Sequence, residues 1–316
     1  MVSRRLIGLG IVCSLLVACG PEPLPPMRIG TIPWPGNEVL AVAEYAGRLD
    51  QAALRRVEFT SNQEVMRALR NGVIEAAALM LDETLLSVQD GLDPVILVAV
   101  DASNGGDAIL AHPPVRDLAG LRGLRVGLQV NSGSVYVLHQ ALRRAHLPID
   151  AINTVNVPPD RQVLMFESGQ VDAVVTYEPM RTQIVNRGGI DLFNTSVITN
   201  DVINLLVVRR DYLTEHPQHG RALIEAWRQG LQVFRSSPEA RAWSAHRQGL
   251  TPQEFEAALG RTTLFDEARN RELLDPNAPQ LRATADRLHA FLREVGLLRA
   301  DVPIAPLFRL PDGFGR

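Results

Sequence analysis

The sequence predicts an α/β protein built from two similar halves. Apolar runs of strand length alternate with segments in which apolar residues recur at helical spacing. The order helix, glycine, acidic residue and buried strand occurs twice, at Gly72-Val73-Ile74-Glu75 and at Gly169-Gln170-Val171-Asp172. A chain of 316 residues is long enough for two domains. The alternation favours parallel sheets with right-handed crossovers.

The first residues resemble a bacterial lipoprotein signal. Arg4 and Arg5 precede the apolar residues 6–17, and Leu16-Val17-Ala18-Cys19 has the small-residue pattern of a cleavage site that ends in cysteine. We therefore expect residues 1–18 to be a signal peptide, Cys19 to be lipidated, and the proline-rich residues 19–26 to form a tether. A plain secretory signal and a membrane anchor are the alternatives.

Composition excludes several classes of function. All 32 basic Lys and Arg positions are arginine, which excludes a P-loop lysine and a Schiff-base lysine. A net charge of −3 gives no basic surface for nucleic acid. The histidines lack metal-ligand spacing, and neither G-x-S-x-G nor H-E-x-x-H occurs. We expect no catalytic residue, no metal and no cofactor.

The first half supplies a candidate aromatic contact. Residues 27–32 form a strand that ends at Pro33-Trp34-Pro35-Gly36, and a helix begins near Asn37. Trp34 is thus at the carboxyl end of a strand, where open α/β sheets bind ligands, although a core position is the alternative. Further on, Asp82-Glu83-Thr84 can cap a helix over residues 85–89. A ligand contact is the second interpretation of Asp82.

The stretch Asp101-Ala102-Ser103-Asn104-Gly105-Gly106-Asp107 interrupts two strand-like runs, residues 95–100 and 108–111. Paired glycines allow the backbone to turn through positive φ and to approach a ligand closely. Ser103, Asn104 and Asp107 supply donors and acceptors beside them. An ordinary turn between strands is the alternative.

Three further positions in the second half are candidates for a binding site. Asn131-Ser132-Gly133-Ser134 opens a helix, whose free N–H groups favour an anion or an acceptor; Asn131 or Ser132 as a simple N-cap is the alternative. Tyr177-Glu178-Pro179 ends a buried strand and can clamp an amine, or Glu178 can lie at the surface before a helix. Asn204 lies in an apolar strand, so it ties two segments together or faces a ligand.

Over residues 27–250 the chain resembles ABC-transporter solute-binding proteins of the nitrate/sulfonate/taurine (SsuA/NMT1-like) family. No single motif is specific, but their order and spacing are. The resemblance is carried by Ile32-Pro33-Trp34-Pro35-Gly36, the 72–76 and 169–173 segments, the 101–109 stretch, Tyr177-Glu178-Pro179 and residues 207–213.

The resemblance implies a type II periplasmic-binding fold, with two α/β lobes, two crossover segments and a ligand cleft between the lobes. Residues 27–111 and 205–316 would form one lobe and residues 112–204 the other, with crossovers near 108–113 and 204–208. The cleft residues that it implies are Trp34, Ser103, Asn104, Asp107, Ser132, Ser134, Tyr177 and Glu178, to which we add Asn204. Such binders often carry an acid at the position of Asn204, so this departure leaves the charge of the cleft in doubt.

The expected function is capture of a small polar solute by lobe closure and its delivery to an ABC permease. Because Asp107 and Glu178 would place two carboxylates at one cleft, we expect an amine-bearing or zwitterionic ligand. If Asp107 only bonds its own loop, a neutral ligand is the alternative, and the start of the helix at Ser132 could hold an anion instead. The N-terminal signal implies a periplasmic or otherwise extracytoplasmic protein held to the membrane by its lipid, and we expect a monomer.

Two other functions fit the same fold. A lipoprotein of this kind can serve a membrane sensor, such as a histidine kinase or a cyclic-dinucleotide enzyme, instead of an importer. Relatives of the fold also act as enzymes of thiamine-pyrimidine and menaquinone synthesis. The expected export of this chain and the lack of a cysteine cluster or metal-spaced histidines argue against an enzyme.

Overall fold

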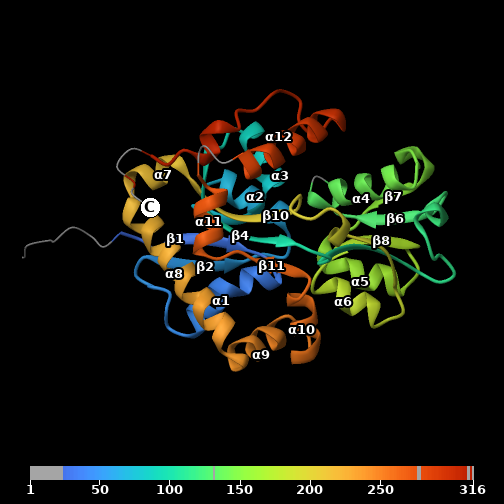
Figure 1. Ribbon diagram of the computed structural model, residues 1–316, viewed down its shortest axis with the longest axis horizontal. Helices are drawn as coiled ribbons and strands as arrows, with labels where there is room; N and C mark the ends of the chain where they lie inside the picture. Colours follow the sequence, from blue (N-terminus) through green and yellow to red (C-terminus); the bar gives the residue numbers. More distant parts are fainter. Residues whose placement is uncertain (1–23, 131, 276–278, 312–313, 315–316) are drawn as a thin grey trace, which may run out of the picture.

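Two mixed β-sheets, each flanked by helices, form the two lobes of the molecule (Figure 1). The computed structural model describes residues 24–130, 132–275, 279–311 and 314. We call the six-stranded sheet with its helices the first lobe and the five-stranded sheet with its helices the second lobe. Within these described ranges, no helix has the length and apolar character needed to cross a membrane.

The sheet of the first lobe has the strand order β11-β4-β10-β3-β1-β2. Strand β1 is parallel to β2 and β3, whereas β10 is antiparallel to both β3 and β4, and β11 is antiparallel to β4. The bounds are β1 Met27–Thr31, β2 Leu54–Glu58, β3 Ala76–Met80, β4 Pro94–Ser103, β10 Ile203–Arg209 and β11 Thr262–Leu264.

The sheet of the second lobe has the order β7-β6-β8-β5-β9. Strands β6, β7 and β8 are parallel, and β5 is antiparallel to β8 and to β9. The bounds are β5 Asp107–Ala111, β6 Arg125–Leu128, β7 Asn153–Asn156, β8 Ala173–Tyr177 and β9 Ile190–Asn194. The expected parallel pairing holds for β1, β2 and β3 and for β6, β7 and β8, whereas β5, β10 and β11 pair antiparallel with their neighbours. Strands β5 and β10 break the parallel order because the chain enters each of them from the other lobe and not from a crossover helix.

The two halves of the chain share one plan, as the repeated sequence pattern predicts. The order β2-β1-β3-β10 in the first sheet matches β7-β6-β8-β5 in the second. In the first lobe Glu75 accepts hydrogen bonds from the backbone and the guanidinium of Arg28. In the second lobe Asp172 accepts the same bonds from Arg125. The acidic residue after each glycine therefore anchors the first strand of its own sheet.

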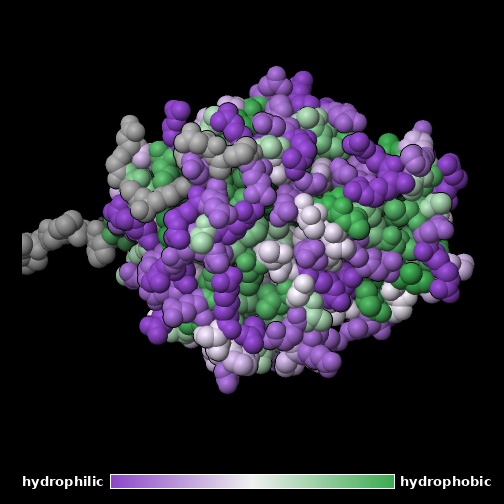
Figure 2. Space-filling model, in the orientation of Figure 1, coloured by the Kyte–Doolittle hydropathy of each residue, from purple (hydrophilic) through white to green (hydrophobic). Residues whose placement is uncertain are grey.

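Helices cover both sheets (Figure 1). Around the first sheet, α1, α8, α9 and α10 pack an apolar core against one face, and α2, α3 and α12 contribute to a core that continues toward the second lobe. The second lobe carries α4, α5 and α6 (Figure 1). Hydrophilic side chains occupy most of the face shown in Figure 2, with apolar side chains in smaller groups between them. The bounds are α1 Glu38–Tyr45, α2 Asn62–Arg70, α3 Leu81–Gln89, α4 Gly133–Arg144, α5 Pro159–Glu167, α6 Met180–Val185, α7 Arg210–Glu215, α8 Pro217–Ser236, α9 Pro238–Arg247, α10 Pro252–Leu259, α11 Glu267–Leu273 and α12 Pro279–Glu294.

The chain passes between the lobes at the polar, glycine-bearing stretch. Strand β4 of the first sheet ends at Ser103, β5 of the second sheet begins at Asp107, and residues 104–106 form the link. Gly105 has a φ of +103°, a conformation that side-chain-bearing residues rarely adopt. The return passage, residues 195–202, joins β9 to β10. Both passages come earlier in the chain than the crossovers expected near 108–113 and 204–208. The reason is that β5 already pairs with the second sheet along its whole length, and β10 already pairs with the first.

Helix α3 begins earlier than the sequence pattern predicts. It starts at Leu81, so Asp82-Glu83-Thr84 forms its first turn and does not precede it. Met80 is the N-cap residue, and its backbone N–H donates to Glu83 Oε2 over 3.0 Å. Glu83 therefore caps the helix from inside it, which fixes this carboxyl beside the end of β3.

Candidate functional site

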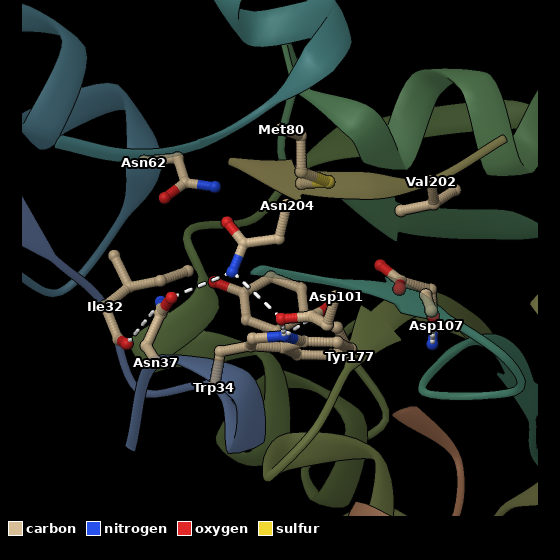
Figure 3. A pocket seen from close by; sticks show the side chains of 11 residues that line it. Ile32, Trp34, Asn37, Asn62, Met80, Asp101, Asp107, Tyr177, Val202 and Asn204 are labelled. Atoms are coloured by element: carbon tan, nitrogen blue, oxygen red, sulfur yellow. Dashed lines mark hydrogen bonds between the residues drawn. The ribbon is translucent and has the colours of Figure 1, made fainter. Parts of the chain in front are cut away.

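A small pocket lies between the two lobes, where β1, β3, β4, β5, β8 and β10 end or begin (Figure 3). The cavity has a volume of about 30 Å³. The lining residues are Ile32, Trp34, Asn37, Asn62, Met80, Asp101, Ser103, Asp107, Tyr177, Val202 and Asn204.

A hydrogen-bonded network forms the wall of the pocket on the side of the first lobe. Trp34 Nε1 lies 3.1 Å from both carboxylate oxygens of Asp101, which is fully buried in β4. Asn204 Nδ2 donates to Asp101 Oδ2 over 3.2 Å and to Asn37 Oδ1 over 2.8 Å. Asn37 Nδ2 in turn donates to the Ile32 carbonyl over 3.1 Å. Figure 3 shows these side chains turned toward one another below Asn62.

The second lobe contributes Asp107 and Tyr177, which face each other in register across β5 and β8. The backbone N–H of Asp107 donates to Ser103 Oγ over 3.1 Å, and that hydroxyl lies 2.7 Å from Thr195 Oγ1. Asp107 is 5% exposed, and its carboxyl lines the pocket. The tyrosine ring meets the Trp34 ring edge-on, with 6.3 Å between the ring centroids. Each lobe therefore brings one carboxyl and one aromatic ring to the pocket.

Burial makes both pocket carboxyls weak acids. Loss of solvation raises the pKa of Asp101 to about 7, although hydrogen bonds from Asn204 and Trp34 oppose the rise. The pKa of Asp107 also rises to about 7, chiefly through burial and further through the charges of Asp82 and Glu178. Burial raises the pKa of the Tyr177 hydroxyl as well. Carboxyls whose pKa values are strongly shifted, as these two are, cluster at functional sites.

The pocket is rich in acceptors, and besides its side-chain nitrogens the hydroxyls of Ser103 and Tyr177 can donate. Four side-chain nitrogens line it, and each already donates within the protein: Trp34 Nε1, Asn37 Nδ2, Asn62 Nδ2 and Asn204 Nδ2. The Asn62 Oδ1 atom is a buried acceptor without a hydrogen-bond partner among the described residues. No arginine lines the pocket within the part of the chain that the structure describes. The arrangement therefore suits a ligand that donates hydrogen bonds and carries positive charge.

Five of the nine residues expected in the cleft come together in this pocket. They are Trp34, Ser103, Asp107, Tyr177 and Asn204. The first alternative posed for Asn204 holds, because this side chain ties Asn37 to Asp101; it also lines the cavity. Cys19 and Asn131 lie outside the described residues.

The start of α4 lies beside the pocket without lining it. Ser132 is the N-cap: its Oγ accepts from the Ser134 N–H over 3.3 Å and donates to the Gln129 carbonyl over 2.8 Å. A Cβ atom added to Gly133 would lie 2.8 Å from Met80 Sδ and 3.6 Å from Asp82 Oδ2. The first lobe therefore already places a carboxyl at this helix start, which disfavours an anionic ligand there.

Asn104 and Glu178 also lie away from the pocket lining. Asn104 is exposed, and its backbone N–H donates to the Arg261 carbonyl over 2.8 Å. Glu178 is fully buried and forms ion pairs with Arg261, at 3.2 Å, and with Arg181, at 3.5 Å. It also accepts from the Thr182 N–H over 3.1 Å. Arg181, three residues along the chain, and Arg261, 83 residues along it, satisfy this carboxylate.

The sequence reasoning missed Asp101, Asn37 and Asn62. Asp101 opens the polar stretch that follows the strand-like residues 95–100, but only Ser103, Asn104 and Asp107 of that stretch were expected in the cleft. Asn37 follows the Trp34-Pro35-Gly36 turn, and Asn62 is the first residue of α2 after the N-cap Ser61. A polar residue at a helix start is so common as a capping residue that neither one carried a signal for binding.

Several contacts hold the lobes together around the pocket. Arg261 of the first lobe meets Glu178 of the second, and Gln63 Nε2 of α2 donates to the Val130 carbonyl. Asn186 Nδ2, which follows α6, donates to Glu254 Oε1 of α10 over 2.6 Å. The described residues contain no group of three or more His, Cys, Asp or Glu side chains arranged to hold a metal ion.

Solved structures share this architecture. An alkanesulfonate-binding protein from Xanthomonas axonopodis pv. citri, bound to MOPS, matches with a TM-score of 0.78 and 20% identity, over 90% of this chain and 98% of that chain. The aliphatic sulphonate-binding protein of Escherichia coli matches with a TM-score of 0.74 and 21% identity, over 91% and 93%. The nitrate-binding protein of Synechocystis PCC 6803 matches with a TM-score of 0.70 and 16% identity, over 90% and 85%. The fold is that of the type II periplasmic binding proteins.

Sequence comparison identifies the family. A putative aliphatic sulfonates-binding protein of Escherichia coli K12 is 23% identical over 243 residues, 76% of each chain. The taurine-binding periplasmic protein of the same organism is 20% identical over 253 residues, 77% of this chain and 78% of the relative. These relatives are binding proteins, not enzymes. Residues 20–248 match the NMT1-like family, to which this chain belongs. It is a solute-binding protein of the kind that serves ABC import systems.

Proposed function

We propose that this protein is an extracytoplasmic, lipid-anchored solute-binding protein that captures a small amine-bearing molecule and delivers it to an ABC permease. The observation that carries the ligand class is the pairing of two buried carboxyls, Asp101 and Asp107, in a pocket that no described arginine lines. Asp101 accepts hydrogen bonds from Trp34 and Asn204, but these donors are uncharged, and a cationic group would balance the charge of the buried carboxylates.

The donors and acceptors that line the pocket also support an amine-bearing ligand. The nitrogens of Asn37, Asn62 and Asn204 already have acceptors, so the anionic end of a zwitterion would depend mainly on the hydroxyls of Ser103 and Tyr177. The edges of the pocket offer the rings of Trp34 and Tyr177 to an ammonium group or to the carbon skeleton next to it. An amine without a strong anionic group therefore suits the pocket better than a zwitterion or a sulfonate.

Lobe closure is the mechanism that fits this arrangement. Asp101 belongs to the first sheet and Asp107 to the second, so only the closed form presents both carboxyls to one ligand. A cation between them offsets their mutual repulsion and stabilises the closed form, which a permease can distinguish from the open one.

A matched pair of probes tests the ligand class. Ethanolamine and isethionate share a hydroxyethyl group and differ in carrying an ammonium or a sulfonate. Calorimetric titration of the purified protein, extended to ethylamine, putrescine and guanidine, should find binding among the amines and none for isethionate. Asp101→Asn and Asp107→Asn should each weaken amine binding by about tenfold or more. Asp90→Asn, which removes an exposed carboxylate paired with Arg70, is the matched control and should leave affinity unchanged. Binding confined to isethionate would overturn the proposal.

A further inference from the structure

Helix α12 near the C-terminus belongs to the first lobe, where it packs on α3 (Figure 1). Its buried residues recur at helical spacing on one face: Leu281, Thr284, Ala285, Leu288, Phe291 and Leu292. The segment that follows α12 is bound by Gln89, the last residue of α3. Gln89 Nε2 donates to the Leu297 carbonyl over 3.0 Å, and Gln89 Oε1 accepts from the Arg299 N–H over 2.5 Å. These contacts fix α12 to the first lobe.

Phe291 of α12 crosses the boundary between the lobes. Its ring meets the Tyr136 ring edge-on, with 5.0 Å between the centroids, and the His139 ring with 5.2 Å. Tyr136 and His139 both belong to α4 of the second lobe, where a spacing of three residues places them on one face of the helix. Phe291 is 8% exposed and Tyr136 is 5% exposed. Because edge-on ring contacts depend on geometry, movement of α4 away from α12 would part these rings.

Asp201, in the passage 195–202, is bound from both lobes at once. The Tyr136 hydroxyl of the second lobe donates to Asp201 Oδ2 over 2.8 Å, and Arg287 Nη2 of α12 donates to Asp201 Oδ1 over 2.7 Å. Burial and the bond to Asp201 raise the pKa of the Tyr136 hydroxyl, which keeps it a donor. Arg287 Nη2 also donates to Thr284 Oγ1 over 3.0 Å, which orients the guanidinium. One carboxylate therefore bridges α4 and α12 at the point where the chain returns to the first lobe.

We propose that α12 is a strap that limits how far the two lobes part, acting through Phe291 and Asp201. The chain joins the lobes at residues 104–106 and 195–202, so opening turns the second lobe about these passages. The strap ties both the second passage and α4 to the first lobe. Within the described ranges α12 contributes no residue to the pocket lining, so it acts on affinity through the population of the closed form. This inference rests on lobe closure, which is part of the proposed function, but not on the amine class of the ligand.

Phe291→Leu tests the apolar contact, since it removes the ring and keeps an apolar side chain. Small-angle X-ray scattering of the unliganded protein should give a larger radius of gyration than in the wild type. Ethanolamine affinity should fall by about three- to tenfold, because the ligand must close a more open population. Phe255→Leu is the matched control: Phe255 meets Phe234 edge-on at 6.1 Å within the first lobe, so both readouts should stay at the wild-type values. Equal changes in the two variants, or an unchanged radius in Phe291→Leu, would overturn the proposal.

The polar bridge is tested by variants that keep the Phe291 contact. Tyr136→Phe and Arg287→Gln each remove one side of the bridge at Asp201, and each should increase the radius of gyration. The double variant should open no further than the more open single variant, because a bridge cut on one side no longer joins the lobes. Tyr212→Phe, which removes a hydroxyl 2.6 Å from His219 Nδ1 within the first lobe, should change nothing. Additive opening in the double variant would show that the two bonds act separately, contrary to a bridge.

Scattering from the unliganded protein separates the strap from the ligand class. A wild type that binds none of the amines, together with expansion in Phe291→Leu and Tyr136→Phe, would contradict the proposed ligand and support the strap. A wild type that binds ethanolamine, together with an unchanged radius and affinity in both variants, would contradict the strap and leave the proposed ligand standing.

Discussion

Trp34 Nε1 is equidistant from the two carboxylate oxygens of Asp101, at 3.1 Å from each. The indole comes from the turn after β1 and the carboxyl from the end of β4, so two non-adjacent strands of the first sheet meet at this contact. The indole N–H stabilises the charged form of a carboxyl that burial would otherwise keep neutral. The tryptophan thus holds Asp101 in place and provides an aromatic wall for the pocket.

Gly36→Ala should disrupt this contact. A Cβ atom at position 36 would lie 1.8 Å from Asp101 Oδ2 and 3.1 Å from Trp34 Nε1, so the carboxyl must move. We expect the free energy of unfolding to fall by about 1–3 kcal/mol through overpacking, and amine affinity to fall by about tenfold. Urea unfolding and calorimetric titration measure the two effects.

Gly260→Ala provides the comparison for that substitution. Gly260 follows α10 in an ordinary helical conformation, and the nearest atoms to an added Cβ are backbone oxygens at 3.4–3.5 Å. Stability should change by less than about 0.5 kcal/mol, and affinity should stay the same. If Gly36→Ala behaves like Gly260→Ala, Asp101 has room to move without loss of binding, and its assigned place in the pocket is wrong.

The stability of the unliganded protein should depend on pH through Asp107. Its folded-state pKa of about 7 exceeds the ordinary value of 3.8, so the folded state binds this proton more tightly. That contribution is fully present below pH 3.8 and is lost as pH rises through 7. From pH 5 to pH 8 the free energy of unfolding should fall in both proteins, and the fall should be about 2–3 kcal/mol smaller in Asp107→Asn than in the wild type. Urea unfolding at the two pH values measures the difference, and parallel curves for the two proteins would contradict it.

Amine binding should become tighter as pH rises from 6 to 8. A bound cation favours the charged forms of Asp101 and Asp107, whose pKa values of about 7 leave both partly protonated near neutrality. Ethanolamine, which stays protonated over this range, should bind about tenfold more tightly at pH 8 than at pH 6, with release of protons. Calorimetry in two buffers of different ionisation enthalpy counts the protons. An affinity that does not change with pH would show that the carboxyls are not the groups that meet the ammonium.

Arg261→Gln should weaken the closed form. Arg261 forms an ion pair with Glu178 across the lobes. When the substitution removes this pair, Glu178 still has Arg181 of the second lobe as a charged partner. Release of a bound amine should accelerate by about three- to thirtyfold, with little change in the association rate. Stopped-flow tryptophan fluorescence can follow both rates. Arg269→Gln removes a partner of Glu272 within α11 and should leave the rates unchanged. Equal effects from the two variants would mean that the pair across the lobes does not control opening.

Local patterns in the sequence were sufficient for much of the fold. The apolar periodicity predicted the alternation of strands and helices, and the glycine-and-acid repeat predicted two equivalent halves, in which Glu75 and Asp172 play the same part. Trp34, Ser103 and Asp107 could be placed in the cleft because each lies at the end or the beginning of a strand. Such patterns report which residues neighbour one another along one element, and the edge of a sheet collects those residues.

Pairing between distant segments was decided only by the tertiary structure. Strand β10 returns to the first sheet between β3 and β4, and this insertion brings Asn204 against Asp101, 103 residues away in the chain. Glu178 forms an ion pair with Arg261, 83 residues away, and does not line the pocket in which its sequence context had placed it. Nothing local encodes these partners, because the strand that carries each residue has the same apolar pattern whichever neighbour it joins. The sequence alone therefore determined the fold class and half of the pocket, whereas long-range packing decided which carboxyls line it.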